Sequence, residues 1–287
     1  MTKAKVFSLV TLGLLWYIAL IVFINVKLCS ESLDASHSKK IEKFDNVVLV
    51  NYAGSAPVYF VNRSVLNISA SVYGISTIYS YSPKDLDYKF NVKNAHILSQ
   101  KRGAGYWLWK PYIILDAMQK TKEGNIILYM DTDCLLKNNI TNLIDIAKKH
   151  KRVLFENFHS NRQYVKRDAY ILMDSDNEDI YNQMQIDAGY LMLVNNKENR
   201  DFVKKWLEYS EDERILTDIP SSLGKELPEF EDHRHEQAIL TLLASKHKDQ
   251  ITITRSERKR YILNYSRANL FDSLVRLCIY VQGIVYG

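Results

Sequence analysis

The sequence predicts an α/β fold, on three observations. A short apolar, β-branched run at 46–50 (NVVLV) leads into the turn-prone residues 51–55, which is typical of a buried first strand. Residues 113–118 carry apolar side chains at helical spacing, and Gly124 ends that helix. A continuous apolar run at 126–130 then suits a strand covered on both faces. Helix, glycine and buried strand indicate a βαβ-type crossover, and open α/β sheets bind ligands at the carboxyl ends of their strands.

The remaining elements continue this pattern. Residues 75–80 predict a second strand, which Ser82-Pro83 ends, and Pro111 fits the first turn of the following helix. Further candidates are strands at 152–156 and 189–194, and amphipathic helices at 198–209 and 236–247. Residues 269–286 are apolar and aromatic at near-helical spacing, so they either dock on the domain or lie on a membrane surface.

The N-terminal residues indicate a membrane anchor. The stretch at 6–26 has no charge over about twenty residues, which is enough to cross a bilayer as a helix. It is longer than the apolar core of a cleavable signal peptide and lacks a small-residue cleavage site. Lys3 and Lys5 favour a single-pass type II orientation, facing the ER or Golgi lumen in a eukaryote, although lysines beyond the stretch weaken this bias. The expected order is a cytosolic tail at 1–5, a transmembrane signal anchor at 6–26, a stem at 27–45 and one folded domain at 46–287.

Composition narrows the function classes. The net charge of the 287 residues is only +5, and Lys and Arg are interspersed with Asp and Glu. A nucleic-acid-binding protein should show a broad basic stripe with interleaved aromatics, so we expect no nucleic-acid partner. Cys29, Cys134 and Cys278 form no C-x-x-C pair, which argues against a zinc site and a disulfide framework. We expect Cys134 to pack in the interior.

Two aspartates directly after the buried run at 126–130 are the strongest chemical signal. In extended backbone, residues two apart point to the same side, so Asp131 and Asp133 would face one spot. Their hard carboxylate oxygens suit Mg²⁺ or Mn²⁺ rather than zinc. Such an ion neutralises a nucleotide diphosphate as it departs. A helix cap or a turn is the alternative interpretation of this pair.

A second cluster, DHRHEQ at 232–237, precedes an amphipathic helix. A neutral imidazole could complete a metal shell there, and Arg234 or the helix N-terminus could hold phosphate oxygens. The alternative is a polar helix start.

A third cluster spans 102–110. Gly103 and Gly105 permit close approach of the backbone to a ligand, Trp107 offers a flat face, and Arg102 and Lys110 offer positive charge. Together they could grip a nucleotide or a sugar. The alternative is that the aromatic side chains belong to the core.

Three segments together carry a resemblance. GYWLWKP at 105–111, LYMDTD at 128–133 and DHRHEQ at 232–237 resemble, in order and separation, a family of GT-A-fold glycosyltransferases from bacteria and large DNA viruses. The likeness covers roughly residues 47–247 and implies a Rossmann-like, mixed and mainly parallel sheet flanked by helices. It further implies a nucleotide-binding first half, an acceptor-binding second half, and a nucleoside-diphosphate sugar as donor, UDP by analogy. The acceptor would be a glycan, a lipid or a protein.

The resemblance also assigns residues to roles. Asp131 and Asp133 match the motif that holds the cation and the diphosphate, and His235 or His233 would be an extra metal ligand. Many family members carry Asp where Glu236 stands, so the role of Glu236 is open. An inverting enzyme needs a carboxylate base, for which Glu236 or Asp187 could serve. The residues expected along the donor site are Asn51, Tyr52, Arg102, Trp107, Lys110, Asp131 and Gly189.

Two other functions fit parts of the pattern. A haloacid-dehalogenase-like phosphatase also places D-x-D after a buried strand, but it continues with Thr or Val where Leu135 stands. A membrane-tethered carbohydrate-binding protein could use the aromatic cluster without turnover. The combined pattern favours a membrane-anchored, metal-dependent glycosyltransferase.

Overall fold

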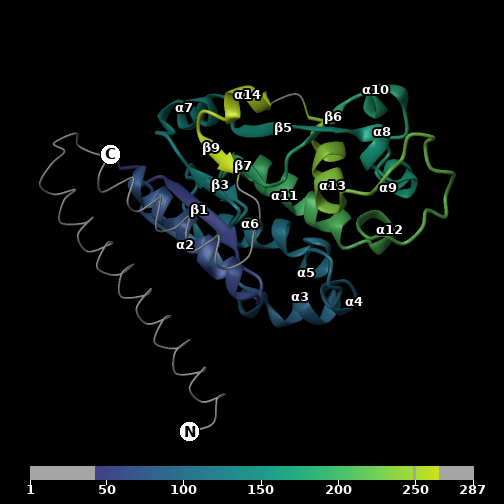
Figure 1. Ribbon diagram of the computed structural model, residues 1–287, viewed down its shortest axis with the longest axis horizontal. Coiled ribbons are helices and arrows are strands. Elements are labelled where there is room, and N and C mark those ends of the chain that lie inside the picture. Colours follow the sequence, from purple (N-terminus) through teal and green to yellow (C-terminus); the bar gives the residue numbers. More distant parts are fainter. Residues whose placement is uncertain (1–42, 248–249, 265–287) are drawn as a thin grey trace, which may run out of the picture. The chain divides into compact units, whose positions relative to one another are not determined.

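The computed structural model describes residues 43–247 and 250–264 (Figure 1). The predicted anchor at 6–26, the tail, nearly all of the stem and the apolar segment at 269–286 lie outside the described residues. Within the described ranges, no helix is long and apolar enough to cross a membrane.

One mixed sheet organises the domain, with strand order β2-β1-β3-β7-β5-β6, β8 beside β5, and a separate β4-β9 pair. The half formed by β2, β1 and β3 is parallel. In the other half β7 is antiparallel to both β3 and β5, and β5 is antiparallel to β6 but parallel to β8. The predicted mixed α/β class is confirmed. The strands are β1 (Val47–Tyr52), β2 (Thr77–Tyr81), β3 (Ile126–Met130), β4 (Cys134–Leu136), β5 (Arg152–Ser160), β6 (Met184–Ile186), β7 (Tyr190–Val194), β8 (Ile251–Ile253) and β9 (Ile262–Asn264).

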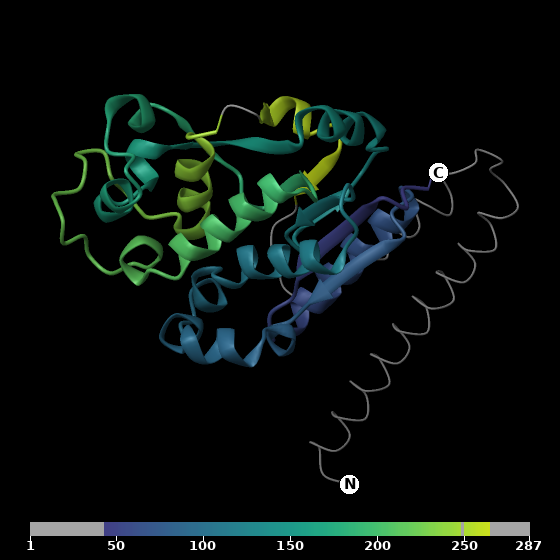
Figure 2. The ribbon, with the colours of Figure 1, turned by 180° about the vertical axis from the view of Figure 1, so that it is seen from behind.

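Helices cover both faces of the sheet. Successive residues of a strand point to opposite faces, so the apolar strands present side chains on both faces for helices to cover. On one face Val48, Ile127 and Leu193 pack with α6, α11 and α13; this face is in front in Figure 2. On the other face Leu49 and Leu128 pack with α2 and α7. The helices are α2 (Pro57–Val72), α3 (Tyr88–Lys93), α4 (Ala95–Leu98), α5 (Gly103–Tyr106), α6 (Trp109–Lys120), α7 (Thr141–His150), α8 (Asn161–Tyr164), α9 (Arg167–Leu172), α10 (Glu178–Tyr181), α11 (Lys197–Ser210), α12 (Glu213–Leu216), α13 (His235–Ala244) and α14 (Arg255–Arg258), with a 3-10 turn η1 (Pro83–Asp85).

The long periodic segments were predicted well. All residues of β1 and β3 are buried, as continuous apolar runs require. The predicted strand at 75–80 is β2, and the predicted helices at 198–209 and 236–247 are α11 and α13. Helices α2 and α7 were not predicted, and β5 continues four residues beyond the predicted 152–156, to Ser160.

Four strand ends meet at one edge of the sheet. The parallel strands β1 and β3 both end there, after Tyr52 and Met130. Because β7 is antiparallel to β3, it begins at this edge, directly after Gly189. Strand β5 is antiparallel to β7, so its carboxyl end lies at the same edge. The order of these ends along the edge is therefore β1, β3, β7 and β5, and residues from all four strands are brought together there.

Candidate active site

Asp131 follows the last residue of β3 and is held by three groups. Its backbone N–H donates to the Gly189 carbonyl at 2.7 Å, which ties the end of β3 to the start of β7. The Tyr129 hydroxyl donates to Asp131 Oδ1. Lys110 Nζ lies 3.4 Å from the same oxygen, and the aspartate side chain is 16% exposed. The carboxylate is thus fixed in place and still reaches the surface.

The Asp131–Asp133 segment forms a turn. The Cys134 N–H donates to the Asp131 carbonyl at 3.1 Å, directly after β3 ends. The predicted alignment of the Asp131 and Asp133 carboxylates by two-residue spacing is therefore wrong, because that period applies only to extended backbone. The carboxylates nevertheless share a region. Burial, followed by the charges of Asp133, Asp131 and Asp187, raises the pKa of the Cys134 thiol well above its ordinary value. Cys134 itself is packed in the core, as expected.

Asp187 and Gly189 bring the start of β7 against Asp131. Asp187 accepts hydrogen bonds from the Gly189 N–H at 2.8 Å and the Tyr190 hydroxyl at 2.7 Å. Burial raises the pKa of Asp187, while the Gly189 hydrogen bond and the Arg258 charge oppose this. A Cβ added to Gly189 would lie 2.9 Å from Asp187 Oδ1 and 3.5 Å from Asp131 Oδ2. Glycine therefore lets two carboxylates lie closer to this backbone than a side chain would allow. We call Asp131, Asp133 and Asp187 the carboxylate cluster.

A buried ion pair adjoins this cluster. Lys110 Nζ donates to Glu236 Oε1 at 2.7 Å and to the Ala188 carbonyl at 3.1 Å. The side chains of Lys110 and Glu236 are only 2% and 6% exposed. Burial raises the pKa of Glu236 to about 7, and the Lys110 charge opposes that shift. Glu236 is thus placed to hold Lys110, so the geometry does not favour its predicted role as the base for an acceptor hydroxyl.

The structure corrects the prediction that His233 is a metal ligand. Its Nε2–H donates to the Ile215 carbonyl at 2.8 Å, and its Nδ1 accepts from the Lys166 N–H at 3.3 Å. Both ring nitrogens are therefore used by the backbone, and no lone pair remains for a metal ion. Burial, together with the charges of His235 and Lys166, lowers the pKa of His233 well below its ordinary value. This imidazole is a neutral, structural side chain.

His235 lies among aromatic rings. Its Nδ1 is 2.8 Å from the Leu216 carbonyl. Its ring centroid is 4.9 Å from that of Tyr106 and 5.5 Å from that of Trp107. Its Nε2 lies 3.7 Å from Asp218 Oδ1, and burial lowers its pKa to about 4. Among the described residues, none of these contacts is with Asp131 or Asp133.

Arg102 belongs with these histidines. It pairs with Asp218 at 3.2 Å and with Asp232 at 2.7 Å. The same charges, Asp218, Arg102 and Asp232, act on the pKa of His235. We call Arg102, His233 and His235 the histidine cluster. Of the basic residues predicted for the donor site, Lys110 therefore reaches Asp131, whereas Arg102 is held by two carboxylates of its own.

The glycines at 103 and 105 serve chain packing. A Cβ on Gly105 would lie 2.6 Å from the Leu98 Cα, and one on Gly103 would lie 2.3 Å from the Trp107 ring. Both have positive φ, as do the neighbouring Tyr106 and Trp107, which costs roughly 1 kcal/mol or more at each non-glycine position. The close approach that was predicted between backbone and ligand thus occurs between two parts of the chain. The strained segment places the Trp107 ring against His235.

Asn51 and Tyr52 lie at the carboxyl end of β1, on the β1 side of Asp131. Tyr52 stacks on Trp109 with ring centroids 3.8 Å apart, and burial raises its pKa to about 12. Asn51 is fully buried and donates to Asn67 Oδ1 at 2.8 Å. Asn51 Oδ1 has no hydrogen-bond partner among the described residues.

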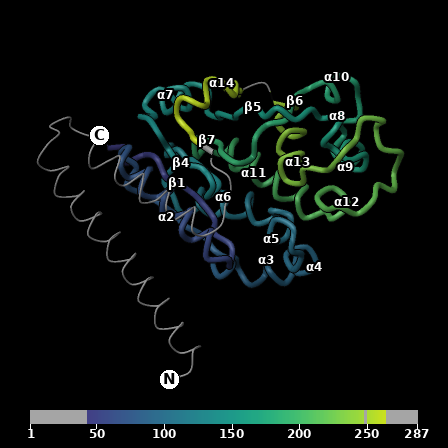
Figure 3. Tube along the Cα trace, in the orientation of Figure 1, coloured from purple at the N-terminus to yellow at the C-terminus, as the bar shows by residue number. Residues whose placement is uncertain are grey.

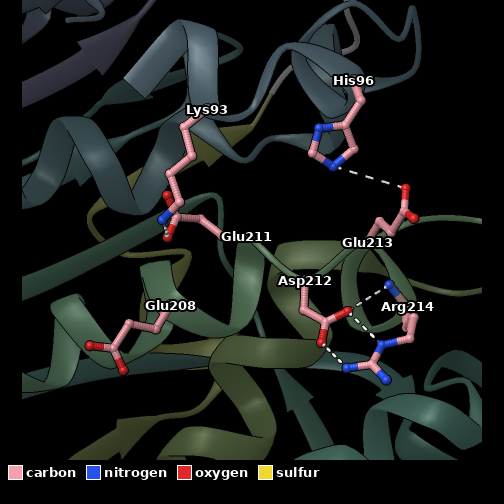
Figure 4. Close-up of a pocket in the computed structure, with 7 residues that line it drawn as sticks. All are labelled: Lys93, His96, Glu208, Glu211, Asp212, Glu213 and Arg214. Carbon is pink, nitrogen blue, oxygen red and sulfur yellow. Dashed lines mark hydrogen bonds and ion pairs between the residues drawn. The ribbon is translucent and has the colours of Figure 1, made fainter. Parts of the chain in front are cut away.

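Two polar hollows lie away from the carboxylate cluster. One of about 510 Å³ is lined by Lys93, His96, Glu208, Glu211, Asp212, Glu213 and Arg214 (Figure 4). Its charges pair with one another, as in Lys93–Glu211 at 2.6 Å and Arg214–Asp212 at 2.6 Å. The second, of about 350 Å³, is lined by Arg102 and the 217–233 segment among others. Neither is lined by Asp131, Asp133 or Asp187.

Comparison with known proteins decides the family. The model of the galactosyl transferase GMA12/MNN10 family, a glycosyltransferase family, matches residues 75–276, which is more than half of the chain. The chain belongs to this family. It is therefore a glycosyltransferase, and the phosphatase and the non-catalytic sugar-binding protein are set aside. No curated protein sequence matches it.

Several solved structures resemble this family member at low identity. A glycosyltransferase involved in glycosylation of the major capsid of PBCV-1 is 11% identical over 81% of this chain and 98% of that one, with a TM-score of 0.46. The galactosyltransferase LgtC, solved with donor and acceptor sugar analogs, is 12% identical over 82% and 95%, with a TM-score of 0.44. Mouse xyloside xylosyltransferase 1 is 11% identical over 72% and 84%, with a TM-score of 0.38.

Three residues of this family member complete the site and were not predicted. Tyr129 could have been predicted from the strand period. It lies two positions before Asp131, so its side chain points to the same side of β3 as that carboxylate. Gln237 Oε1 accepts from the Ala188 N–H at 3.4 Å and from the Asn157 amide at 3.2 Å. Arg258 comes from α14, near the end of the described chain, and no local signal connects it with Asp187.

Proposed function

We propose that this glycosyltransferase moves a sugar from a nucleoside-diphosphate donor, UDP by family analogy, to a glycan, lipid or protein acceptor in a metal-dependent reaction. The observation that carries the proposal is that the Asp131 and Asp187 carboxylates both lie against Gly189 at one edge of the sheet, with Asp133 in the turn that follows Asp131. Carboxylates gathered in this way repel one another unless a cation or hydrogen-bond donors offset their charge.

The donor set fits a hard divalent cation. Among residues 43–247 and 250–264, no group of three or more His, Cys, Asp and Glu side chains is arranged to hold a metal ion. Mg²⁺ is, however, commonly bound by one or two carboxylates together with substrate phosphates. Asp131 and Asp133 would supply the protein ligands for Mg²⁺ or Mn²⁺. When bound, the ion would supply Lewis-acid neutralisation of the departing diphosphate.

The remaining side chains have separate tasks. Lys110 offsets the negative charge of Asp131 and Glu236, and its buried pair with Glu236 fixes its position. Asp187 is 20% exposed and thus more accessible than Glu236. If the reaction inverts the anomeric carbon, Asp187 is the carboxylate placed to accept the proton of the acceptor hydroxyl. If it retains configuration, no such base is required.

The test is a panel of sugar nucleotides with Mn²⁺, scored by release of the nucleoside diphosphate. We expect one donor to be hydrolysed or transferred, excess chelator to stop the release, and Asp133→Asn to abolish it. Asp145→Asn is the matched control, because Asp145 is an exposed aspartate on α7 that pairs with Lys148 at 3.7 Å. Release at the full rate in excess chelator or in Asp133→Asn would contradict the proposal.

We also propose that residues 6–26 anchor the enzyme as a single-pass type II membrane protein. The support is the uncharged stretch and the lysines that precede it. The full-length chain should remain with the membrane pellet after alkaline carbonate extraction. Its recovery in the supernatant would reject the anchor.

A further inference from the structure

Three aromatic rings in contact with one another, one exposed and two half-buried, lie at the carboxyl end of β5. The ring centroids of Phe158 and His159 are 4.1 Å apart, and those of His159 and Tyr164 are 4.3 Å apart. A guanidinium covers each end, Arg255 at 4.9 Å over Phe158 and Arg234 at 4.8 Å over Tyr164. Phe158 is 60% exposed. We call Phe158, His159 and Tyr164 the aromatic ladder.

The backbone is distorted to build this ladder. Neighbouring residues of a regular strand point to opposite faces, yet the rings of Phe158 and His159 contact each other. The pairing of β5 with β6 shifts register between Glu156 and Ser160, which is the segment that holds both rings. Such bulges re-aim side chains and are over-represented next to active sites.

The ladder adjoins the carboxylate cluster. The Asp187 N–H donates to the Phe155 carbonyl of β5 at 2.7 Å. Partial burial and Arg234 lower the pKa of His159, while Asp187 and Glu231 act in the opposite direction. His159 is therefore within electrostatic reach of Asp187. Figure 3 shows α14 alongside β5, and this helix supplies Arg255 to the ladder and Arg258 to Asp187.

Topology separates the ladder from the donor side of the site. Along the sheet edge, the β1 end with Asn51 and Tyr52 lies on one side of Asp131, and the β7 and β5 ends lie on the other. The nucleotide is expected at the parallel half, as in other open α/β sheets. A second substrate would then approach Asp187 from the β5 side.

The chemistry of the ladder suits a sugar ring. A pyranose has an apolar C–H face, which packs on flat rings, and a rim of hydroxyls, which needs polar partners. The ladder offers both. The Phe158 side chain, 60% exposed, supplies apolar surface. Arg255, Arg234 and Glu231 supply polar partners, and Glu231 Oε2 accepts from the Tyr164 hydroxyl at 2.9 Å.

We propose that the aromatic ladder is the acceptor subsite, where a sugar ring of an acceptor glycan stacks beside Asp187. The proposal rests on the proposed glycosyl transfer for its biological meaning. It concerns binding alone, and is tested without turnover.

The experiment is saturation-transfer NMR on the full-length protein with UDP and the methyl glycosides of galactose, glucose, mannose and xylose. At least one glycoside should receive saturation at its ring C–H protons. This signal should fall by about fivefold or more in Phe158→Ala and in His159→Ala, and His159→Phe should restore it. The UDP signals should not change.

Tyr88→Ala is the matched control, since Tyr88 is an aromatic residue of α3 with 78% exposure. It should leave the glycoside signal intact, and all variants should keep the wild-type unfolding midpoint. The proposal is overturned if no glycoside receives saturation, or if the signal persists in Phe158→Ala. It is also overturned if the variants lose the UDP signal and keep the glycoside signal, because the ladder would then be a surface that stacks on the nucleotide base. Failure of every sugar nucleotide in the turnover panel would instead reject the proposed function and leave these binding results standing.

Discussion

The carboxylate cluster and the histidine cluster both come largely from the motif segments, yet their side chains contact different kinds of groups. In the histidine cluster each ring donates to a backbone carbonyl, and Arg102 is paired with two carboxylates. In the carboxylate cluster Lys110 lies 3.4 Å from Asp131 and 2.7 Å from the adjoining Glu236. Arg258 lies 4.0 Å from Asp187. The difference teaches that a distinctive motif can mark either side chains that hold a neighbouring backbone segment or a place where carboxylates gather.

Removal of Lys110 should have the largest effect on stability. Lys110→Met leaves the buried Glu236 without its partner, and breaking a buried ion pair costs roughly 3–5 kcal/mol. The double variant Lys110→Met, Glu236→Gln should recover much of this loss in free energy of unfolding, measured with denaturant, but not the catalytic activity. Equal stability of the single and double variants would show that the pair is not coupled.

The histidine cluster should control acid sensitivity. His235 has a pKa lowered to about 4, so its unfolded form binds a proton below about pH 6.5 that the folded form does not. Stability should therefore be full above pH 6.5 and fall as the pH drops towards 4, by up to about 1.4 kcal/mol per pH unit for each such histidine. His233 shifts in the same direction.

Denaturant unfolding between pH 4.5 and 7 checks this. His235→Phe should flatten the profile, and His96→Gln, at an exposed histidine, should not. If Mn²⁺ bound through His233 or His235, added Mn²⁺ would offset the acid sensitivity of the free protein. Such an offset would assign these histidines to the metal site and contradict their structural role.

A side chain at position 189 should impair catalysis more than folding. A methyl group there would lie 2.9 Å from Asp187 Oδ1, so one carboxylate must shift. Misplacement of catalytic groups typically costs about tenfold or more in rate, and we expect Gly189→Ala to lower kcat/KM by that order. The unfolding midpoint should change little. Full activity of Gly189→Ala would mean that the reaction does not depend on the present positions of these two carboxylates.

Substitution of Arg102 should have the smallest effect on stability and on donor binding. Its side chain is 41% exposed, and ion pairs of exposed groups contribute about 0–1 kcal/mol. Arg102→Ala should therefore cost less than about 1 kcal/mol of unfolding free energy and leave the KM for the donor within about twofold. A large rise in donor KM would return Arg102 to the donor site that the sequence predicted.

Local sequence patterns were sufficient to predict the strands that carry the site, but not which strands they pair with. The apolar runs of β1 and β3 are readable because every residue is buried. The placement of Gly189 against Asp131 depends on the antiparallel register of β3 and β7, which local sequence does not encode. The turn at Asp131 likewise leads into β4, whose partner β9 comes more than a hundred residues later.

The structural role of His233 and His235 could not be predicted from local sequence either. Their hydrogen-bond acceptors are the carbonyls of Ile215 and Leu216, at the end of α12. Nothing in the string DHRHEQ indicates that these carbonyls need donors. Backbone groups left over at a helix end must be satisfied by something, and here two imidazoles do so.

The most direct test of the carboxylate cluster is calorimetric binding of UDP with and without Mn²⁺, in the wild type, Asp131→Asn, Asp133→Asn and the control Asp145→Asn. We expect Mn²⁺ to tighten UDP binding in the wild type and the control, and each cluster variant to lose about a hundredfold of that affinity while keeping the fold. UDP affinity that is the same with Mn²⁺ and with chelator, or that is unchanged in Asp133→Asn, would contradict the account.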